Sequence, residues 1–428
     1  MEKKVYERLH ETLYQEILAN GLKVYVLPKP GFQKTYATFS THYGSIDNHF
    51  RVSGESEVRV PDGIAHFLEH KMFAEPTGDI FATFATQGAS ANAFTSFDRT
   101  AYLFSATEQI HENLNTLLNF VQNPYFTEEN VEKEKGIIGQ EITMYQDNPD
   151  WRVYFGLIEA LYQKHPVHID IAGTIASITR IDKETLYACY NTFYHPSNMM
   201  LFVVGGVDPE EIMSIVRENQ ANKQFPHQGD IERIFEREPT DVNTQLKTTH
   251  LPVSLPKCML GFKEDALGLE GEALLRLELT TKVMLDCLFS PSSTLYQTLY
   301  DENLISDSFG HEYNCIKDYA FSVIGGDTND VVLLQQRINE MVMDTIKSGI
   351  SITDFERSRK KKIGGFLRML NSPESIANEF TKYQFKGNDL FEMLPLYESL
   401  TLEAVNARLR EHFQWDRLAV SIVIGDSA

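Results

Sequence analysis

The chain has 428 residues, with 39 Lys and Arg against 60 Asp and Glu, so its formal charge at pH 7 is −21. This acidic balance argues against nucleic-acid binding, which needs a basic surface, and it is compatible with cationic peptides as substrates. The length exceeds what one ordinary hydrophobic core supports, so we expect at least two domains. The charged fraction of 23% is that of a soluble globular protein.

Two features bear on the cellular compartment. The cysteines are widely scattered and form no C-x-x-C pair, which fits a reducing environment; they are Cys189, Cys258, Cys287 and Cys315. The N-terminal segment Met1–Arg8 lacks the apolar core of a signal peptide, and the longest apolar run, Met199–Val207, has the length of a buried strand. We therefore predict a cytoplasmic protein.

The first predicted elements are strands at Gly21–Leu27 and Thr35–Tyr43, followed by a helix that carries the motif HFLEH. Its histidines, His66 and His70, are four residues apart, so on a helix they are neighbours and can bind one metal ion together. Glu69 lies between them in angle, where it can accept a proton from a metal-bound water that attacks a peptide carbonyl. This H-x-x-E-H order is that of the inverted zinc peptidases. The alternative is an amphipathic helix whose histidines are merely hydrogen-bonded or solvated.

A strand is predicted next, from Ser90 to Phe104. Its first residues lie in the run GASANAFT, whose small side chains would let another backbone approach and add to the sheet edge. We expect Asn92, Ala93 and Phe94 to bind a peptide substrate, with Asn92 hydrogen-bonding to a substrate carbonyl. The alternative is an ordinary interior strand with a polar end.

Helices are predicted around residues 108–123 and 127–147. The second of these has Thr127 as its expected N-cap and apolar residues at helical spacing, namely Val131, Ile138 and Ile142. Glu134 and Glu141 are seven residues apart and therefore share one face of this helix. A catalytic zinc site uses three protein ligands and leaves a position for water, so one glutamate can complete the site while the other supports it. Spacing alone does not say which glutamate is the ligand.

Further helices around 150–164 and 182–193 and a strand at Met200–Gly205 complete the first half. His165 and His168 are three residues apart across a proline, so we expect a structural loop there and not a metal site. No role is assigned to His111 or His195.

The second half repeats the first at an offset of about 220 residues. The run from Ile181 to Gly205 resembles the run from Leu400 to Gly425, and the region around Glu134–Pro149 resembles Ser358–Pro373. In this register Glu141 corresponds to Gly365 and Glu134 to Ser358, and the counterpart of the motif helix, around Leu274–Leu288, has no histidine pair. Strands grouped with long amphipathic helices indicate an α+β fold. We predict a catalytic domain at 1–225, a polar linker at 226–239 and a homologous domain without metal ligands at 240–428.

Four segments resemble the insulinase/pitrilysin family of inverted zinc metallopeptidases, in its bacterial processing-protease branch: GIAHFLEHKMF, GASANAFTSFDRTAYLFSA, VEKEKGIIGQEITMYQDNP and TFYHPSNMMLFVVGGVD. The resemblance is dense from about Tyr6 to Pro209. It implies that His66, His70 and Glu141 bind Zn²⁺, that Glu69 is the general base, and that Glu134 supports the site. It also implies that the NAFT segment is the substrate edge. For each domain it implies a mostly antiparallel sheet with helices on one face, and the two domains would close like a clam shell.

The chain departs from the family in its second half. Many active members have an arginine and a tyrosine there that contact the substrate carbonyl or stabilise the tetrahedral intermediate. The matching segment is Ser293–Asp307, where Tyr300 stands at the arginine position and no tyrosine follows at the end. In two-chain members of the family, a degenerate sister subunit supplies this pair. We therefore predict the zinc subunit of a heterodimer, with a homodimer as the fallback.

Three functions compete at this level. The leading one is a zinc endopeptidase that hydrolyses unfolded peptides inside an enclosed chamber. A non-catalytic scaffold subunit of a peptidase complex is the rival, although such relatives lose the metal motif that this chain keeps. A purely structural zinc site is disfavoured because the sequence shows no convincing fourth protein ligand.

Overall fold

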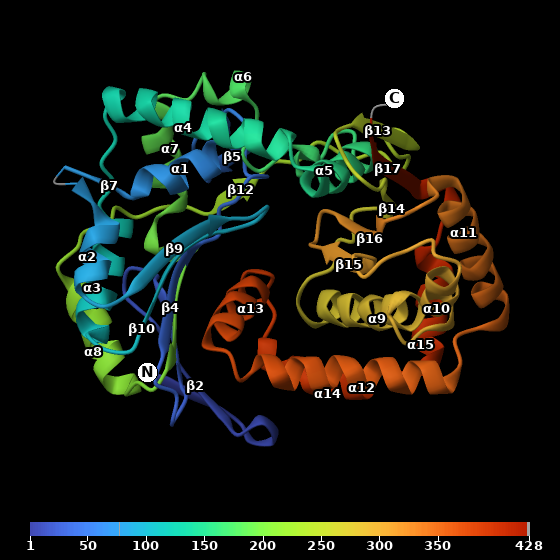
Figure 1. Ribbon diagram of the computed structural model, residues 1–428. Helices are drawn as coiled ribbons and strands as arrows, with labels where there is room; N and C mark the ends of the chain where they lie inside the picture. Colours follow the sequence, from blue (N-terminus) through green and yellow to red (C-terminus); the bar gives the residue numbers. More distant parts are fainter. Residues whose placement is uncertain (77, 426–428) are drawn as a thin grey trace. The chain divides into compact units, whose positions relative to one another are not determined.

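The computed structural model describes residues 1–76 and 78–425 of the chain. They form two compact units, neither of which is one continuous segment (Figure 1). Unit 1 consists of Met1–Ile142, Ile169–Phe235 and Met369–Phe385. Unit 2 consists of Thr143–His168, Glu236–Arg368 and the chain from Lys386 onward.

A seven-stranded sheet in the order β1-β2-β3-β11-β4-β10-β9 forms the centre of unit 1. β3 and β11 are parallel, and the other neighbouring pairs are antiparallel. β11, with the sequence MMLFVVG, is buried along its whole length because helices cover both faces of the sheet. In sheet order the strands are Glu2–Tyr6, Glu11–Ile17, Lys23–Pro28, Met199–Gly205, Thr35–Thr41, Thr100–Ala106 and Ser90–Thr95.

The helices of unit 1 lie on two sides of this sheet. α1, α3 and α8 pack against β3, β4, β9 and β10, whereas α13 packs against β4 and β11 from the opposite side (Figure 1). The ring of Phe380 in α13 stacks on that of Phe202 in β11, with centroids 4.3 Å apart. The helices are α1 (Ile64–Met72), α2 (Ile80–Thr86), α3 (Ile110–Val121), α4 (Glu128–Gln146), α6 (Ile175–Ile178), α7 (Lys183–Phe193), α8 (Pro209–Ala221) and α13 (Pro373–Phe385). Small sheets are formed by β12 (Ile231–Arg233), β5 (His49–Val52) and β6 (Val58–Arg59), and by β7 (Ala74–Glu75) and β8 (Gly78–Asp79).

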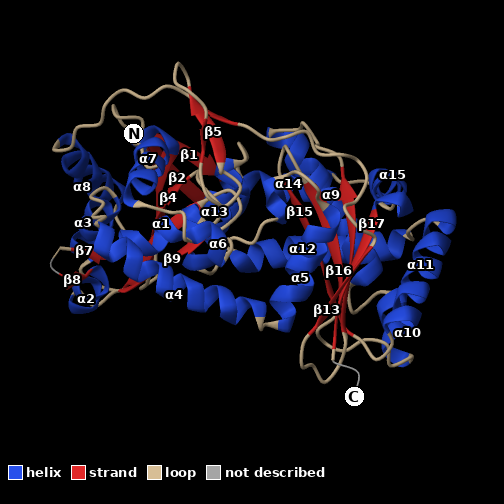
Figure 2. Cartoon of the chain, turned by 90° about the horizontal axis from the view of Figure 1, so that it is seen from above, coloured by secondary structure: helices blue, strands red, loops and turns tan. Residues whose placement is uncertain are grey.

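Unit 2 has a five-stranded sheet in the order β13-β17-β14-β16-β15. Figure 2 shows this sheet with α5 on one side and α11 and α15 on the other. The strands in that order are Leu246–His250, Leu418–Ile424, Lys257–Glu264, Ala320–Asp327 and Gly310–Cys315. The helices are α5 (Pro149–Leu161), α9 (Gly271–Phe289), α10 (Thr294–Asp301), α11 (Val331–Ser348), α12 (Ile352–Met369), α14 (Met393–Ser399) and α15 (Leu402–His412).

The strand order confirms that the chain contains two similarly built domains. The order β3-β11-β4-β10-β9 in unit 1 matches β13-β17-β14-β16-β15 in unit 2. In both sheets the first of these pairs is parallel and the others are antiparallel. The fold is α+β, as the sequence predicts.

The two halves of the chain each contribute one helix to the unit that is formed mainly by the other half. α5 follows α4 in the chain yet packs on β13, β14 and β17 of unit 2, whereas α13 packs on the sheet of unit 1. β14 approaches α5 closely at Gly261, because a Cβ at this position would lie 2.9 Å from the side chain of Leu157. The units therefore differ from the contiguous ranges 1–225 and 240–428, and each sheet has a second helix layer in addition to the predicted one.

Local signals explain several helix starts. The side chain of Asn148 accepts hydrogen bonds from the backbone amides of Asp150 and Trp151, and Pro149 occupies the first turn of α5. Asp208 and Pro209 begin α8 in the same way, and Asp182 caps α7. Each is a typical N-terminal pattern in which a short polar side chain satisfies amides that lack a helical partner.

Two predicted segments need correction. The strand expected from Ser90 to Phe104 is a hairpin, in which β9 and β10 are joined by a tight turn where the amide of Ser96 donates to the carbonyl of Arg99 over 2.8 Å. That turn contains neither glycine nor proline, so the usual turn signal is missing. The expected linker 226–239 contains β12, which pairs with β5. In the described part of the chain, no helix has both the length and the apolar character needed to cross a membrane.

Candidate metal centre

Helix α1 holds the motif residues in the core of unit 1. All of its other side chains are buried, namely those of Ile64, Ala65, Phe67, Leu68, Lys71 and Met72. The helix begins after Gly63, whose φ of 85° favours glycine, and a Cβ at this position would lie 2.4 Å from the carbonyl oxygen of Ala172. The backbone before the motif is therefore fixed by a close approach that only glycine permits.

Helix α4 supplies the carboxylates. Thr127 and Asn130 cap it reciprocally, since the side chain of each accepts a hydrogen bond from the backbone amide of the other. The apolar positions Val131, Ile138 and Ile142 are buried, as their spacing predicts. This anchoring presents both Glu134 and Glu141 to α1.

Three donor atoms converge between the two helices. The Nε2 atoms of His66 and His70 lie 3.7 Å and 3.4 Å from the same oxygen, Oε2 of Glu141. The three side chains each offer one ligand atom, and these atoms all lie within 4.8 Å of one another. Ligand atoms bound to one tetrahedral zinc ion are roughly 3.3 Å apart. The spacing in this cluster is therefore close to what a single metal ion requires.

The electrostatics of the two histidines also suit a metal. Burial lowers the pKa of His66 to about 4, and the neighbouring charge of His70 adds to this effect. The imidazole of His66 is therefore neutral at pH 7 and has a lone pair to give. Its buried Nδ1 has no hydrogen-bond partner among the described residues. Two imidazole nitrogens and one carboxylate oxygen form a donor set that zinc accepts, with a coordination position left for water.

Glu69 lies beside this cluster and is held by the sheet. Its Oε2 accepts a hydrogen bond from Oγ1 of Thr95 in β9, at 2.9 Å. Burial raises the pKa of Glu69, although the charge of His70 and the bond from Thr95 oppose this shift. A carboxylate fixed by one oxygen and surrounded by the core is a well-positioned proton acceptor.

Glu134 supports His70 from outside the donor set. Its Oε1 lies 3.2 Å from Nδ1 of His70, and its Oε2 accepts from Nζ of Lys71 at 3.3 Å. Burial opposes ionisation of Glu134, but the bond with His70 and the charge of Lys71 outweigh it, so its pKa lies below the usual value. A carboxylate on Nδ1 leaves Nε2 of His70 directed at Glu141, which is the usual way in which a metal-binding histidine is oriented.

The residues predicted to bind substrate lie on β9, the last strand of the unit 1 sheet. β9 pairs with β10 on one side. Side chains alternate along a strand, so Ala93 shares the face of Thr95, while Asn92 and Phe94 lie on the other. The backbone amide of Ala93 donates to Oδ1 of Asn92 at 2.9 Å, and the guanidinium of Arg99 lies over the ring of Phe94 at 5.6 Å.

Sequence reasoning missed two contacts of this centre. Thr95 holds Glu69, but it lies on a strand that is brought to α1 only by the fold. Lys71 contacts Glu134 and is 3% exposed. Its position directly after the motif, on the same helix as His70, was the available signal.

In unit 2, the segment Ser293–Asp307 contains α10. Tyr300 is 48% exposed, and its ring stacks on that of Tyr296 with centroids 6.3 Å apart. The sequence places a tyrosine where the family pattern has an arginine, and the structure places that tyrosine on a helix surface.

Comparison with known proteins identifies the class. A family model described as insulinase (peptidase family M16) matches residues 56–175, which include the whole motif helix and Glu134 and Glu141 of α4. A second model, described as the peptidase M16 inactive domain, matches residues 180–362. The chain belongs to this family.

Individual relatives match most or nearly all of the chain. It is 53% identical over 425 residues to the uncharacterized zinc protease YmfH of Bacillus subtilis (strain 168), covering 99% of both proteins. It is 26% identical to YmxG, another uncharacterized zinc protease of the same organism, over 83% of this chain and 87% of the relative. The crystal structure of an M16-like peptidase from Alicyclobacillus acidocaldarius superimposes with a TM-score of 0.94 at 42% identity, covering 97% of this chain and 99% of that one.

Proposed function

We propose that this protein is a zinc-dependent endopeptidase that hydrolyses unfolded peptides. One observation carries the proposal: Nε2 of His66 and Nε2 of His70 face the same oxygen of Glu141, with the buried carboxylate of Glu69 beside them. The names of the relatives, zinc proteases, support the choice of metal.

Each residue has a separate task in this proposal. When bound, zinc would supply a water of lowered pKa and a Lewis acid for the scissile carbonyl. His66, His70 and Glu141 would hold the ion. Glu69 accepts the proton of the attacking water and returns it to the leaving amine, while Thr95 keeps the carboxylate in place. Glu134 fixes the ring of His70.

We propose that the substrate adds to the sheet as a strand beside β9. The amide of Ala93 now donates to the side chain of Asn92, so this donor is satisfied locally. A peptide carbonyl can replace Oδ1 of Asn92 as its acceptor, which frees the carboxamide of Asn92 to bond to the peptide as well. Phe94 is fixed by Arg99 and would contact a substrate side chain.

We further propose that the chain is the catalytic subunit of a heterodimeric processing peptidase. Tyr300 stands where an arginine is expected, so a sister chain would supply the arginine and tyrosine that stabilise the oxyanion. A homodimer is the fallback, and a weakly active or non-catalytic zinc-binding scaffold is the alternative function. The cysteines are free and buried, which supports a reducing compartment, and we propose the cytoplasm.

The test compares Glu69→Gln with His66→Ala. Loss of a general base costs about 10²–10⁴-fold in rate, so Glu69→Gln should keep one zinc per chain and lose turnover of a quenched fluorescent peptide. His66→Ala should lose both zinc and turnover. Zinc is measured by elemental analysis of the purified protein. Cleavage by Glu69→Gln at the wild-type rate would refute the role of Glu69, and a wild-type chain that binds no zinc would refute the metal centre.

The partner is tested separately. The wild-type chain alone should cleave slowly, and addition of the sister chain should raise the rate. Full activity of the purified single chain would refute the heterodimer while leaving the peptidase intact. Zinc binding without cleavage, both alone and with the sister chain, would favour the scaffold.

A further inference from the structure

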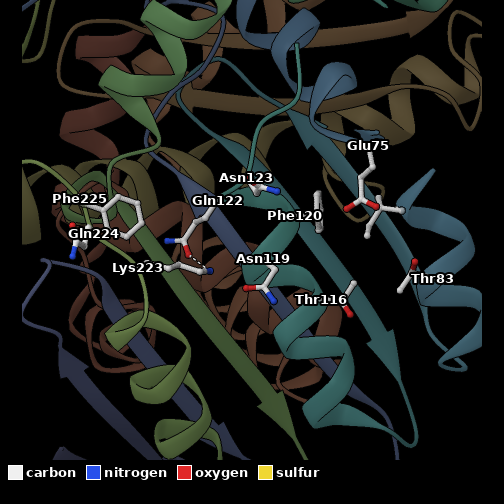
Figure 3. Close-up of a pocket in the computed structure, with 11 residues that line it drawn as sticks. Glu75, Thr83, Thr116, Asn119, Phe120, Gln122, Asn123, Lys223, Gln224 and Phe225 are labelled. Carbon is white, nitrogen blue, oxygen red and sulfur yellow. Dashed lines mark hydrogen bonds between the residues drawn. The ribbon is translucent and has the colours of Figure 1, made fainter. Parts of the chain in front are cut away.

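Unit 1 contains a cavity that shares no residue with the metal centre. Its volume is about 600 Å³, and it lies between β7, α2, α3 and the segment that follows α8. Its walls are mostly polar and include Glu75, Thr83, Asn119, Gln122, Asn123 and Lys223 (Figure 3). A cavity of this size and polarity is suited to a small hydrophilic ligand.

Lys223 brings an uncompensated positive charge to one side of this cavity. Its Nζ donates to the carbonyl oxygen of Leu118 at 3.1 Å and to Oε1 of Gln122 at 2.7 Å, both of which are neutral. Among the described residues no carboxylate lies within ion-pair distance of this ammonium. Burial lowers its pKa to about 8, so the group is still mainly charged at pH 7. An ammonium has three donors, and the third is left for a ligand.

Glu75 brings a negative charge to the other side. Figure 3 shows its carboxylate across the labelled group from Lys223, with Asn119 and Phe120 between them. The side chain is half-buried, and no cation among the described residues lies within ion-pair distance of it. Two opposite charges thus line one cavity without neutralising each other.

The groups between the charges are amides. Both ends of the Gln122 amide are bonded: its Oε1 accepts from Nε2 of Gln220 at 2.8 Å and from Lys223, and its Nε2 donates to Oε1 of Gln220 at 3.2 Å. Oδ1 of Asn119 accepts from Nδ2 of Asn219 at 3.0 Å, which leaves its own NH₂ group directed elsewhere. A carboxamide that keeps free donors, as that of Asn119 does, is complementary to the carbonyls of a peptide backbone.

We propose that this cavity binds a short peptide with both ends free, its carboxylate at Lys223, its ammonium at Glu75 and its backbone against Asn119 and Asn123. A ligand with a single charge leaves one wall charge uncompensated, and a dianion is repelled by Glu75. A zwitterion matches both walls. Three of the wall residues, Thr116, Asn119 and Phe120, lie on α3, which packs against α8 and the sheet of unit 1.

The binding test uses the zinc-loaded Glu69→Gln protein, so that peptides are not consumed. Alanine and its di-, tri- and tetrapeptides are titrated by calorimetry, and the best of them is then compared with its N-acetylated and C-amidated forms. We expect saturable binding of at least one peptide and a loss of roughly 10-fold or more when either end is blocked. No saturation below 10 mM for any of the peptides, on the order of the weakest useful affinity, would overturn the proposal.

Matched variants assign the two ends. Lys223→Met should abolish the preference for a free carboxylate, and Glu75→Gln should abolish the preference for a free ammonium. The exposed Lys34→Met and Glu55→Gln are the controls and should bind as the parent does. If both cavity variants bind and discriminate like the controls, the peptide binds elsewhere and the proposal is wrong.

Metal removal separates this site from the metal centre. Binding should persist after treatment with EDTA, because no wall residue is a metal ligand. Binding that disappears with the metal and is insensitive to Lys223→Met would place the peptide at the zinc site, and it would overturn the cavity proposal without affecting the proposed peptidase function.

Discussion

The two units carry different side chains between corresponding pairs of helices. In unit 1, α1 and α4 enclose His66, His70 and Glu141, which face a common point. In unit 2 the corresponding helices are α9 and α12, and they enclose Asp286, whose carboxylate lies 2.8 Å from Nζ of Lys361 and 3.3 Å from Nζ of Lys362. Both units therefore place carboxylates against this helix pair, but they neutralise them by different means.

The two helix pairs differ in whether the positive charge that neutralises the carboxylate belongs to the chain itself. Burial disfavours the charge of Asp286, yet the two lysines outweigh it and lower its pKa. In unit 2 the positive charges are lysine side chains of α12, whereas the donor atoms of unit 1 can bind an exchangeable cation. Gly365, the counterpart of Glu141, offers no side chain at all.

The first test removes the proposed carboxylate ligand from unit 1 and adds a carboxylate at the corresponding position of unit 2. Glu141→Gln should weaken zinc binding by more than the roughly 10–100-fold that loss of a supporting partner causes, and peptidase activity should fall with it. Gly365→Glu should add no zinc to unit 2, since α9 has no histidine pair. Elemental analysis and a zinc titration measure both. A second zinc per chain in Gly365→Glu would mean that unit 2 retains a usable site.

The second test removes the two lysines that neutralise Asp286 and measures the effect on the stability of unit 2. Lys361→Met with Lys362→Met leaves Asp286 buried without its main partners, and we expect unit 2 to lose about 3 kcal/mol of unfolding free energy. Both tryptophans, Trp151 and Trp415, lie in unit 2, so their fluorescence in urea reports on this unit.

Adding Asp286→Asn to the double variant should recover most of the lost unfolding free energy, because the buried charge is then gone. The exposed Lys347→Met is the matched control. An unchanged midpoint in the double variant would show that the lysines are not what stabilises Asp286.

A third test uses pH. In unit 2, Glu264 accepts from Arg408 and lies 2.6 Å from Nδ1 of His412. Burial opposes its ionisation, but His412 and Arg408 outweigh this and lower its pKa from 4.5 to about 2. A lowered carboxyl pKa stabilises the fold above pH 4.5, and this contribution is lost as the pH falls towards 2.

The measurement compares wild type with Glu264→Gln. Their difference in unfolding free energy, followed by tryptophan fluorescence, should shrink by on the order of 3 kcal/mol between pH 5 and pH 2. A difference that is constant over this range would show that Glu264 ionises normally.

The smallest expected effect concerns the support of His70. Glu134→Gln keeps the shape of the side chain but removes its charge, and we expect a loss of about 10–100-fold in zinc affinity or activity. Glu129→Gln, an exposed change on the same helix, is the control. If the two variants behave alike, His70 is oriented by something other than Glu134.

The sequence could predict the elements of the metal centre because they follow helical spacing. His66, Glu69 and His70 lie on one helix, and the seven-residue interval puts Glu134 and Glu141 on one face of another. Spacing could not divide the roles of the two glutamates, and only the family resemblance did so. Thr95 was beyond reach, because it meets Glu69 only when β9 folds against α1. The exchange of α5 and α13 was hidden for a similar reason, since hydrophobic periodicity shows that a helix has a buried face but not which sheet covers it.

That exchange sets the order in which the newly made chain can mature. The sheet of unit 1 is complete once β11 ends at Gly205, but α13, which covers the face carrying Tyr25 and Phe202, begins only at Pro373. During synthesis of the intervening residues that face has no partner from its own unit, and exposed apolar sheet surface promotes aggregation. We expect chains truncated before Pro373 to be retained by chaperones or degraded rather than to persist as smaller folded proteins. The metal centre would then reach its mature surroundings only when translation is nearly finished.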